Sequence, residues 1–60
     1  MELTETELEI IKYIKQNLSY KDIALKMGKN HTFVLTHYNK ILTKFDVNDR
    51  IQLVNKLSNL

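Results

Sequence analysis

The sequence predicts an all-α fold, a compact domain of four helices within residues 1–60. The chain has no proline and a single glycine, so few residues interrupt a helix. Apolar residues recur at intervals of three and four, which is the spacing of one face of a helix. Residues typical of helix N-caps precede these apolar segments. At 60 residues the chain suffices for one small domain.

The first helix is predicted over residues 4–18. Thr4 with Glu7 three residues later is a capping-box pattern, in which each side chain accepts a hydrogen bond from the other residue's backbone N–H. The buried stripe is expected to comprise apolar residues at helical spacing, with Ile10 beside them: Leu8, Ile11, Ile14 and Leu18.

The second helix is predicted over residues 19–27, with Ser19 as its N-cap and Asp22 in the capping-box position. Its inward residues are expected to be Ile23, Ala24 and Met27. Gly28 follows, and we expect it to end the helix in the left-handed conformation that glycine adopts easily.

Asn30 is the expected N-cap of a third helix over residues 30–45. At 100° per residue, one side of this helix is apolar, with His37 at its edge: Val34, Tyr38, Ile41 and Phe45. The opposite side is mostly polar: Thr32, Leu35, Thr36, Asn39, Lys40 and Thr43. The first side is expected to face the core.

The fourth helix is predicted from an Asn48 cap to about Leu60. Its apolar arc covers about half its circumference, with Ile51, Val54 and Leu57 on one flank. The other flank holds Leu53, Leu57 and Leu60. This arc is wider than a terminal helix needs for its own core, which predicts a second surface to bury. The expected partner is a copy of the same helix, with Leu53, Leu57 and Leu60 at the dimer interface; Leu57→Asp should then weaken the dimer more than the fold.

Composition excludes several kinds of site. Without cysteine there is neither a disulfide nor a thiolate zinc site, and the two histidines lie six residues apart with no carboxylate at ligand spacing. We therefore expect no metal and no cofactor. No Ser/His/Asp set, carboxylate pair or glycine-rich phosphate loop is present, so an enzyme is not expected.

Charge and hydropathy indicate an anionic partner and no membrane. No apolar run approaches the roughly 20 residues that span a bilayer, and the acidic start MELTETELE is unlike a signal peptide. The expected compartment is the cytoplasm. The first ten residues hold four Glu, whereas the other fifty hold nine Lys and Arg against three Asp, a net charge of +6. A basic body favours a partner such as nucleic acid.

Ala24, Gly28 and Val34 have the spacing of a helix-turn-helix. The small residue lets the second helix of the motif approach the first. The glycine makes the sharp turn, and the β-branched residue packs back against the first helix. In such a motif the second helix projects into the major groove of DNA.

A wider set of residues, in unbroken register, carries a resemblance to a known family: Leu3, Thr4, Glu7, Glu9, Ile10, Leu18, Ser19, Lys21, Ile23, Ala24, Gly28, Val34, His37, Ile41, Lys44, Phe45, Val47, Arg50 and Val54. With these residues, the segment 3–54 resembles the LuxR/GerE-type DNA-binding domain found at the ends of many bacterial response and quorum-sensing regulators. Sigma-factor region 4 has a related fold, but His37 and the Val47–Arg50 pair favour the LuxR type.

The resemblance implies that the second and third helices form the helix-turn-helix and that the fourth mediates dimerisation. It implies a phosphate contact for Lys21, and base contacts for Leu35, Thr36 and Asn39. The implied contacts nearer the DNA strands are Thr32, Lys40 and Lys44. Arg50 is expected to anchor the last helix, through a pair with Asp46.

The sequence departs from the family at several positions, among them Lys29, Asn30 and Phe33. The departure that matters most is Leu35, where the family usually has Lys or Arg. A basic side chain bidentate to guanine is the commonest specific contact, and leucine cannot make it. Leucine can touch a thymine methyl and Asn39 can pair with adenine, so an A·T-rich site is the more natural target.

Two functions remain open from the sequence. The first is a sequence-specific DNA-binding transcriptional regulator, or its isolated DNA-binding domain, that binds double-stranded DNA as a homodimer. The alternative is a small protein-interaction module that binds another LuxR-type regulator through the last helix and does not need DNA. The helix-turn-helix spacing and the basic body favour the first, whereas Leu35 favours the second.

Overall fold

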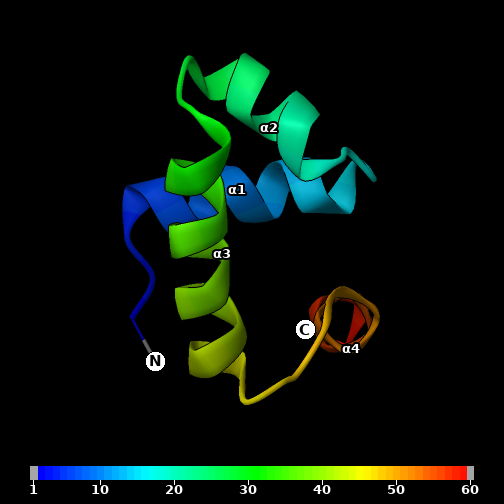
Figure 1. Ribbon diagram of the computed structural model, residues 1–60. Coiled ribbons are helices and arrows are strands. Elements are labelled where there is room, and N and C mark those ends of the chain that lie inside the picture. The colour runs from blue at the N-terminus through cyan, green and yellow to red at the C-terminus, as the bar shows by residue number, and fades with distance from the viewer. Residues whose placement is uncertain (1, 60) are drawn as a thin grey trace.

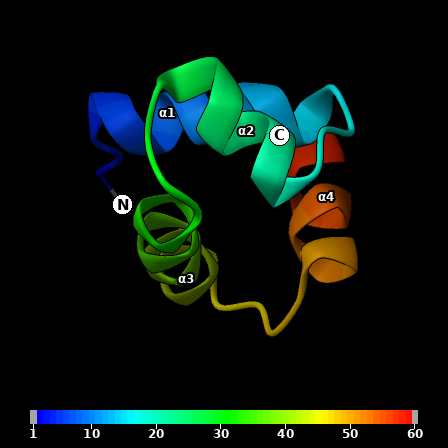
Figure 2. The ribbon, with the colours of Figure 1, turned by 45° about the horizontal axis from the view of Figure 1, so that its top comes forward.

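The computed structural model describes residues 2–59, which form four helices. They are α1 (Glu5–Lys15), α2 (Tyr20–Met27), α3 (His31–Phe45) and α4 (Arg50–Ser58). The longest helix, α3, starts beside α1 and α2 and extends away from them, and α4 is seen end-on beside its far half (Figure 1). The turned view in Figure 2 shows α3 and α4 on opposite sides of a common centre. The prediction of an all-α, four-helix fold is confirmed.

Side chains from all four helices fill this centre. The buried hydrophobic residues are Ile10, Ile11, Ile14, Ile23, Ala24, Val34, Tyr38, Ile41, Phe45, Leu53 and Leu57. The four predicted core residues of α3 are all among them, because a helix with one continuous apolar side buries that side as a unit. No helix within residues 2–59 has the length and apolar character needed to cross a membrane.

The predicted caps of the first three helices are confirmed. In α1, the Thr4 hydroxyl accepts from the Glu7 N–H at 3.1 Å and the Glu7 carboxylate accepts from the Thr4 N–H at 2.8 Å, which completes the capping box. The Ser19 hydroxyl caps α2 by accepting from the Asp22 N–H, although the Asp22 side chain does not complete the capping box predicted there, and the Asn30 amide oxygen caps α3. Each cap satisfies a backbone N–H that the helix itself cannot pair.

The predicted cap of α4 is wrong by one residue. Asp49 caps the helix, since its carboxylate accepts from the Gln52 N–H at 2.9 Å. Asn48 lies in the preceding turn, where its own N–H donates to the Gln52 side chain. A carboxylate at this place also interacts favourably with the positive end of the helix dipole.

Three helices end in a residue with left-handed backbone: Asn17 after α1, Gly28 after α2 and Asp46 after α3, with φ of 64°, 65° and 56°. The N–H of the next residue then reaches the carbonyl five residues back, at 3.0 to 3.2 Å: Leu18 to Tyr13, Lys29 to Ala24, and Val47 to Leu42. This is the Schellman motif, and it turns the chain sharply with few residues. The α2–α3 turn of the helix-turn-helix is one of the three.

We expect Gly28→Ala to lower the free energy of unfolding by about 1–2 kcal/mol, because a Cβ is disfavoured in the left-handed conformation. A Cβ at this position meets no other atom within 4 Å, so the cost is conformational. Gly28→Asn should cost less, since Asn17 already holds the same conformation in this chain. Urea denaturation of both variants measures the difference, and equal losses would contradict this explanation.

The buried stripe of α1 differs from the predicted one. Leu8 is 52% exposed, whereas Glu7 is only 2% exposed. The capping box turns the Glu7 side chain back toward the N-terminus of α1, where Lys44 of α3 meets it. A contact between segments 37 residues apart therefore decides which of two neighbouring residues is buried.

Leu53 and Leu57, which were expected at a dimer interface, lie inside the single chain. Their side chains are 0% and 5% exposed and belong to the core of the single chain, while Leu60 lies outside the described residues. The apolar residues that α4 exposes are Ile51, at 75%, and Val54, at 38%. The wide arc thus has one flank that closes the chain's own core and a second flank that nothing within residues 2–59 covers.

Candidate nucleic-acid interface

The outer face of α3 is polar, exposed and free of acidic residues. Thr32, Thr36, Asn39 and Lys40 are all exposed, and all were predicted DNA contacts. Helix α3 contains no Asp or Glu, and its first turn, where a negative charge would offset the helix dipole, has none. An anion that approaches this face therefore meets no like charge on the helix.

Leu35 lies at the edge of this face and is half-buried. It is less available than its exposed neighbours Thr32 and Thr36. Any contact that Leu35 makes with a ligand is apolar, since it replaces the basic side chain expected at this position.

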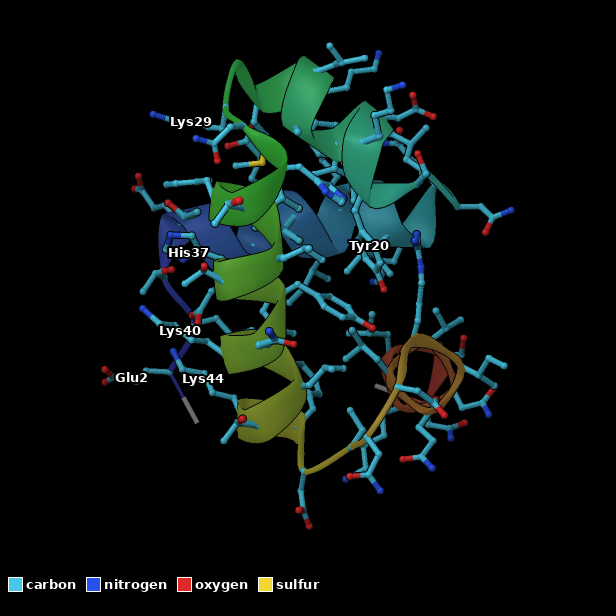
Figure 3. All side chains as sticks on the ribbon, viewed as in Figure 1. Glu2, Tyr20, Lys29, His37, Lys40 and Lys44 are labelled. Carbon is cyan, nitrogen blue, oxygen red and sulfur yellow. The ribbon has the colours of Figure 1, made fainter. Side chains whose placement is uncertain are left out.

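Lys21 lies in the first turn of α2, exposed, two residues after the Ser19 cap. Its neighbour Tyr20 lies between α3 and α4 (Figure 3). The Tyr20 ring packs on Tyr38, with ring centroids 4.6 Å apart, and the Arg50 guanidinium lies 5.2 Å from its centre. Tyr20 is therefore part of the packing between helices, and Lys21 is the residue of this pair left for a ligand.

Arg50 anchors the start of α4, as predicted, but with a different partner. Its guanidinium donates to the Leu18 carbonyl in the α1–α2 turn, and the predicted pair with Asp46 is wrong. Asp46 instead adopts the left-handed conformation that ends α3. Burial, together with a hydrogen bond to Tyr20, raises the pKa of the adjacent Tyr38, so its phenol stays neutral. This cluster fixes α4 and the start of α2 to one another.

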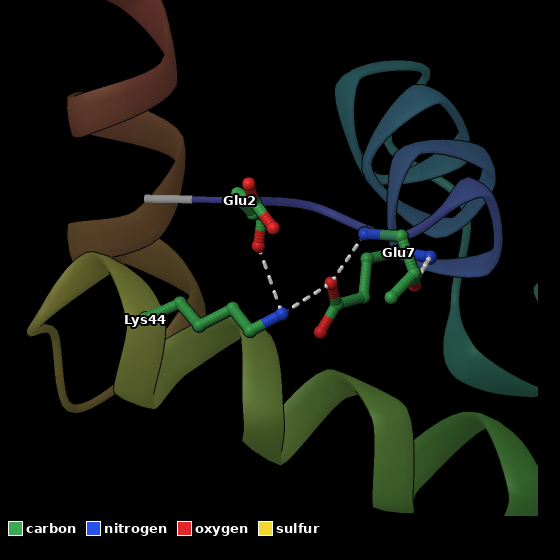
Figure 4. Close-up of polar contacts among 4 residues, drawn as sticks. Glu2, Glu7 and Lys44 are labelled. Carbon is green, nitrogen blue, oxygen red and sulfur yellow. Dashed lines mark hydrogen bonds and ion pairs between the residues drawn. The ribbon is translucent and has the colours of Figure 1, made fainter.

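Lys44 is held by the N-terminal segment. Its ammonium donates to a Glu7 carboxylate oxygen at 2.7 Å and to the Glu2 carbonyl at 3.0 Å (Figure 4). The same Glu7 oxygen also accepts from the Thr4 N–H. The hydrogen bond from Lys44 is the main cause of a lowered pKa at Glu7, and the Thr4 backbone bond adds to it, while burial opposes both.

Lys44 was expected to contact a DNA strand, whereas here it is bound within the chain. Its charge is engaged by a carboxylate that is 2% exposed, so a contact with phosphate would leave a buried negative charge without its partner. Lys44 thus joins α3 to α1 in the described structure. Lys40, one turn earlier, is exposed.

A second edge of α3 carries basic and aromatic side chains. The Lys29 ammonium lies 5.2 Å from the centre of the Phe33 ring, and that ring lies 4.4 Å from the His37 ring. Figure 3 shows Lys29, His37 and Lys40 on the same side of α3. The outer face of the helix thus has positive charge along one border.

A family match covers the segment that contains the helix-turn-helix, its left-handed glycine and the exposed α3 face. Residues 1–57 match the family described as bacterial regulatory proteins, luxR family. The chain belongs to this family.

The relatives of this LuxR-type domain include proteins named as HTH-type transcriptional regulators from Mycobacterium bovis and two strains of Mycobacterium tuberculosis. Each is 33% identical to the chain over 54 residues, which is 90% of the chain. The chain spans 6% of the length of these relatives. No solved structure gives a significant match.

Two features of this LuxR-type domain were missed from the sequence. One is the Glu7–Lys44 pair, for which the only local signal was a capping-box glutamate beside an apolar stripe. The other is the exposed flank of α4, at Ile51 and Val54, because the interface was expected on the opposite flank, at Leu53, Leu57 and Leu60.

Proposed function

We propose that this LuxR-type domain is a sequence-specific DNA-binding regulator that acts as a homodimer, with α3 in the major groove. The observation that carries the proposal is the exposed, acid-free face of α3, which a helix-turn-helix with a Schellman turn holds clear of the core. Family membership supports a regulatory role over an enzymatic one. Such a regulator acts on DNA in the bacterial cytoplasm.

The proposed roles follow from position and chemistry. Thr36 and Asn39, at the middle of the face, reach base edges, and the Asn39 amide suits adenine. The residues toward the DNA strands are Lys21, Thr32 and Lys40. Leu35 adds only an apolar contact at the border of the face. This part of the helix therefore has no basic side chain that could make a bidentate contact with guanine. An A·T-rich target site follows from this set.

We expect duplex binding that weakens steeply with salt, with a slope of log affinity against log salt of about −0.9 for each phosphate contact. Lys21→Ala should weaken binding to all sequences alike. It should also reduce the magnitude of this slope by about 0.9, the value of one phosphate contact. Asn39→Ala should change the preferred site but leave the slope unchanged. Titrations at two salt concentrations, with sites selected from a random duplex library, measure both.

Lys12→Ala is the matched control for Lys21→Ala, because Lys12 is an exposed lysine on α1, away from the helix-turn-helix. It should leave affinity and slope nearly unchanged. Absence of binding at low salt, or binding without salt dependence, would overturn the proposal.

The proposed dimer surface is the exposed flank of α4. Ile51 and Val54 border a hollow of about 270 Å³ whose other lining residues are polar: Asn17, Arg50 and Asn55. An exposed apolar pair with amide groups around it resembles a small interface, with an apolar centre and a polar rim. A second copy of the same flank is self-complementary, as a two-fold interface requires.

Ile51→Asp is expected to weaken the dimer while the domain stays folded, because Ile51 is 75% exposed and the new carboxylate lies at the favourable end of the α4 dipole. Sedimentation measures the association, and circular dichroism measures the fold. Leu8→Asp is the matched control, since it places the same charge on an exposed leucine of α1. Equal association of the two variants would show that α4 is not the interface.

The second candidate function is binding to another LuxR-type regulator through the same flank of α4, without a need for DNA. Leu35 favours it, because that position lacks the basic side chain usual in the family. Affinity capture from the source cell separates the two candidates. Recovery of DNA favours the regulator, whereas recovery of a LuxR-type protein without DNA favours the interaction module.

A further inference from the structure

The outer face of α3 has a shallow, open depression in its C-terminal half. A depression of about 330 Å³ is lined by Asn39, Lys40, Thr43 and Lys44. It lies one to two turns beyond Thr36 on the face proposed to lie in the groove, and all four lining residues are exposed on that side of the helix. A duplex that docks on this face therefore meets the depression as well.

The floor of the depression is apolar. The Thr43 hydroxyl donates to the Asn39 carbonyl at 3.1 Å, so its polar group is engaged by its own helix and its methyl group is left for a ligand. Lys40 and Lys44 also line the depression, and a lysine side chain offers methylene carbon beside its charged end. The depression thus offers carbon surface in the middle of a polar face.

One lining side chain is also held in place. The Lys44 ammonium is bound to Glu7 and to the Glu2 carbonyl, so this lining side chain is ordered before a ligand binds (Figure 4). A site whose lining is already ordered loses less conformational entropy when a ligand binds. Lys40, which also lines the depression, adds a positive charge that suits the phosphates on either side of a groove.

The four base pairs differ in what they offer such a site. In the major groove only thymine presents a methyl group, and adenine presents the donor and acceptor that match an asparagine amide. We propose that the depression receives the methyl group of a thymine next to the adenine that Asn39 reads. The inference rests on the proposed function and deepens it, because it places the thymine contact at Thr43 and not at the half-buried Leu35.

The test replaces thymine with uracil, which removes only the methyl group. Sites are first selected from a random duplex library, and each thymine is then replaced singly. At one thymine position in each half-site, the uracil substitution should lower the affinity of the domain for the duplex about fourfold. This is the value of one methyl-sized group removed from water. At that position Thr43→Ser should reduce the loss to less than about twofold, because serine keeps the hydroxyl but lacks the methyl.

Thr32→Ser is the matched control, since it makes the same change on an exposed threonine of the same face outside the depression. It should leave the full uracil effect in place. A uracil effect of equal size in wild type and Thr43→Ser would overturn the inference. So would salt-dependent DNA binding that no uracil substitution weakens, in which case the proposed function still stands. Absence of DNA binding at any salt concentration would overturn both.

Discussion

Leu57→Asp is expected to unfold the domain. Leu57 is 5% exposed and packs in the core with Leu53, so the substitution buries an unpaired carboxylate among apolar side chains. The expected cost is about 4 kcal/mol or more. A single core in a chain of this size rarely supplies more than about 3–5 kcal/mol, so little folded protein should remain at neutral pH.

Far-ultraviolet circular dichroism and urea denaturation measure this effect. Ile51→Asp is the matched control on the same helix, because the same carboxylate then replaces a side chain that is 75% exposed. It should retain the helical signal of the wild type. If Leu57→Asp stays folded and loses only its association, then Leu57 lies at the interface expected from the sequence and not in the core.

The fourth helix has a local sequence pattern that fixes its position but not its orientation. The positions of all four helices could be predicted, because caps and apolar spacing are local signals that act within a few residues. The side of α4 that faces the core could not. Its apolar arc includes both Leu53 and Ile51, and either flank satisfies the same periodicity. The choice depends on contacts with α3 and with the α1–α2 turn, such as those of Lys56 with Phe45 and Arg50 with Leu18.

The candidate site likewise contains residues whose exposure could be predicted from the sequence and one residue, Lys44, whose contacts could not. Thr32, Thr36, Asn39 and Lys40 could be placed from α3 alone, since its core side is strongly apolar and the opposite side must be exposed. Lys44 could not be placed so, because it meets a carboxylate 37 residues away. Charge counts and helical angles treat every surface lysine alike. Only the packing of α1 against α3 separates a lysine bound within the chain from one available to a ligand.

Lys44→Met is expected to lower the free energy of unfolding by about 2 kcal/mol. It keeps most of the stem but leaves the Glu7 carboxylate, 2% exposed, with the Thr4 N–H as its remaining partner in the network. Breaking a fully buried pair costs about 3–5 kcal/mol. The smaller value applies because the Lys44 side chain is 34% exposed, so solvent screens part of the interaction.

The matched control is Lys40→Met, one turn earlier on the same helix. Lys40 is exposed and makes no ion pair within residues 2–59, so the free energy of unfolding should change by less than about 0.5 kcal/mol. The double variant Glu7→Gln/Lys44→Met should lose less stability than the two single changes predict together, because they remove one interaction.

The loss from Lys44→Met should depend on pH. Lys44 lowers the pKa of Glu7 in the folded protein below its value in the unfolded chain, which is about 4.3. A carboxylate with a lowered folded-state pKa contributes stability above the unfolded pKa, and that stability is lost as the pH falls through the folded pKa. Wild type and Lys44→Met should therefore differ most near neutral pH and converge once Glu7 is protonated in both. A difference that stays constant on acidification would mean that Lys44 stabilises the domain through the packing of its stem and not through its charge.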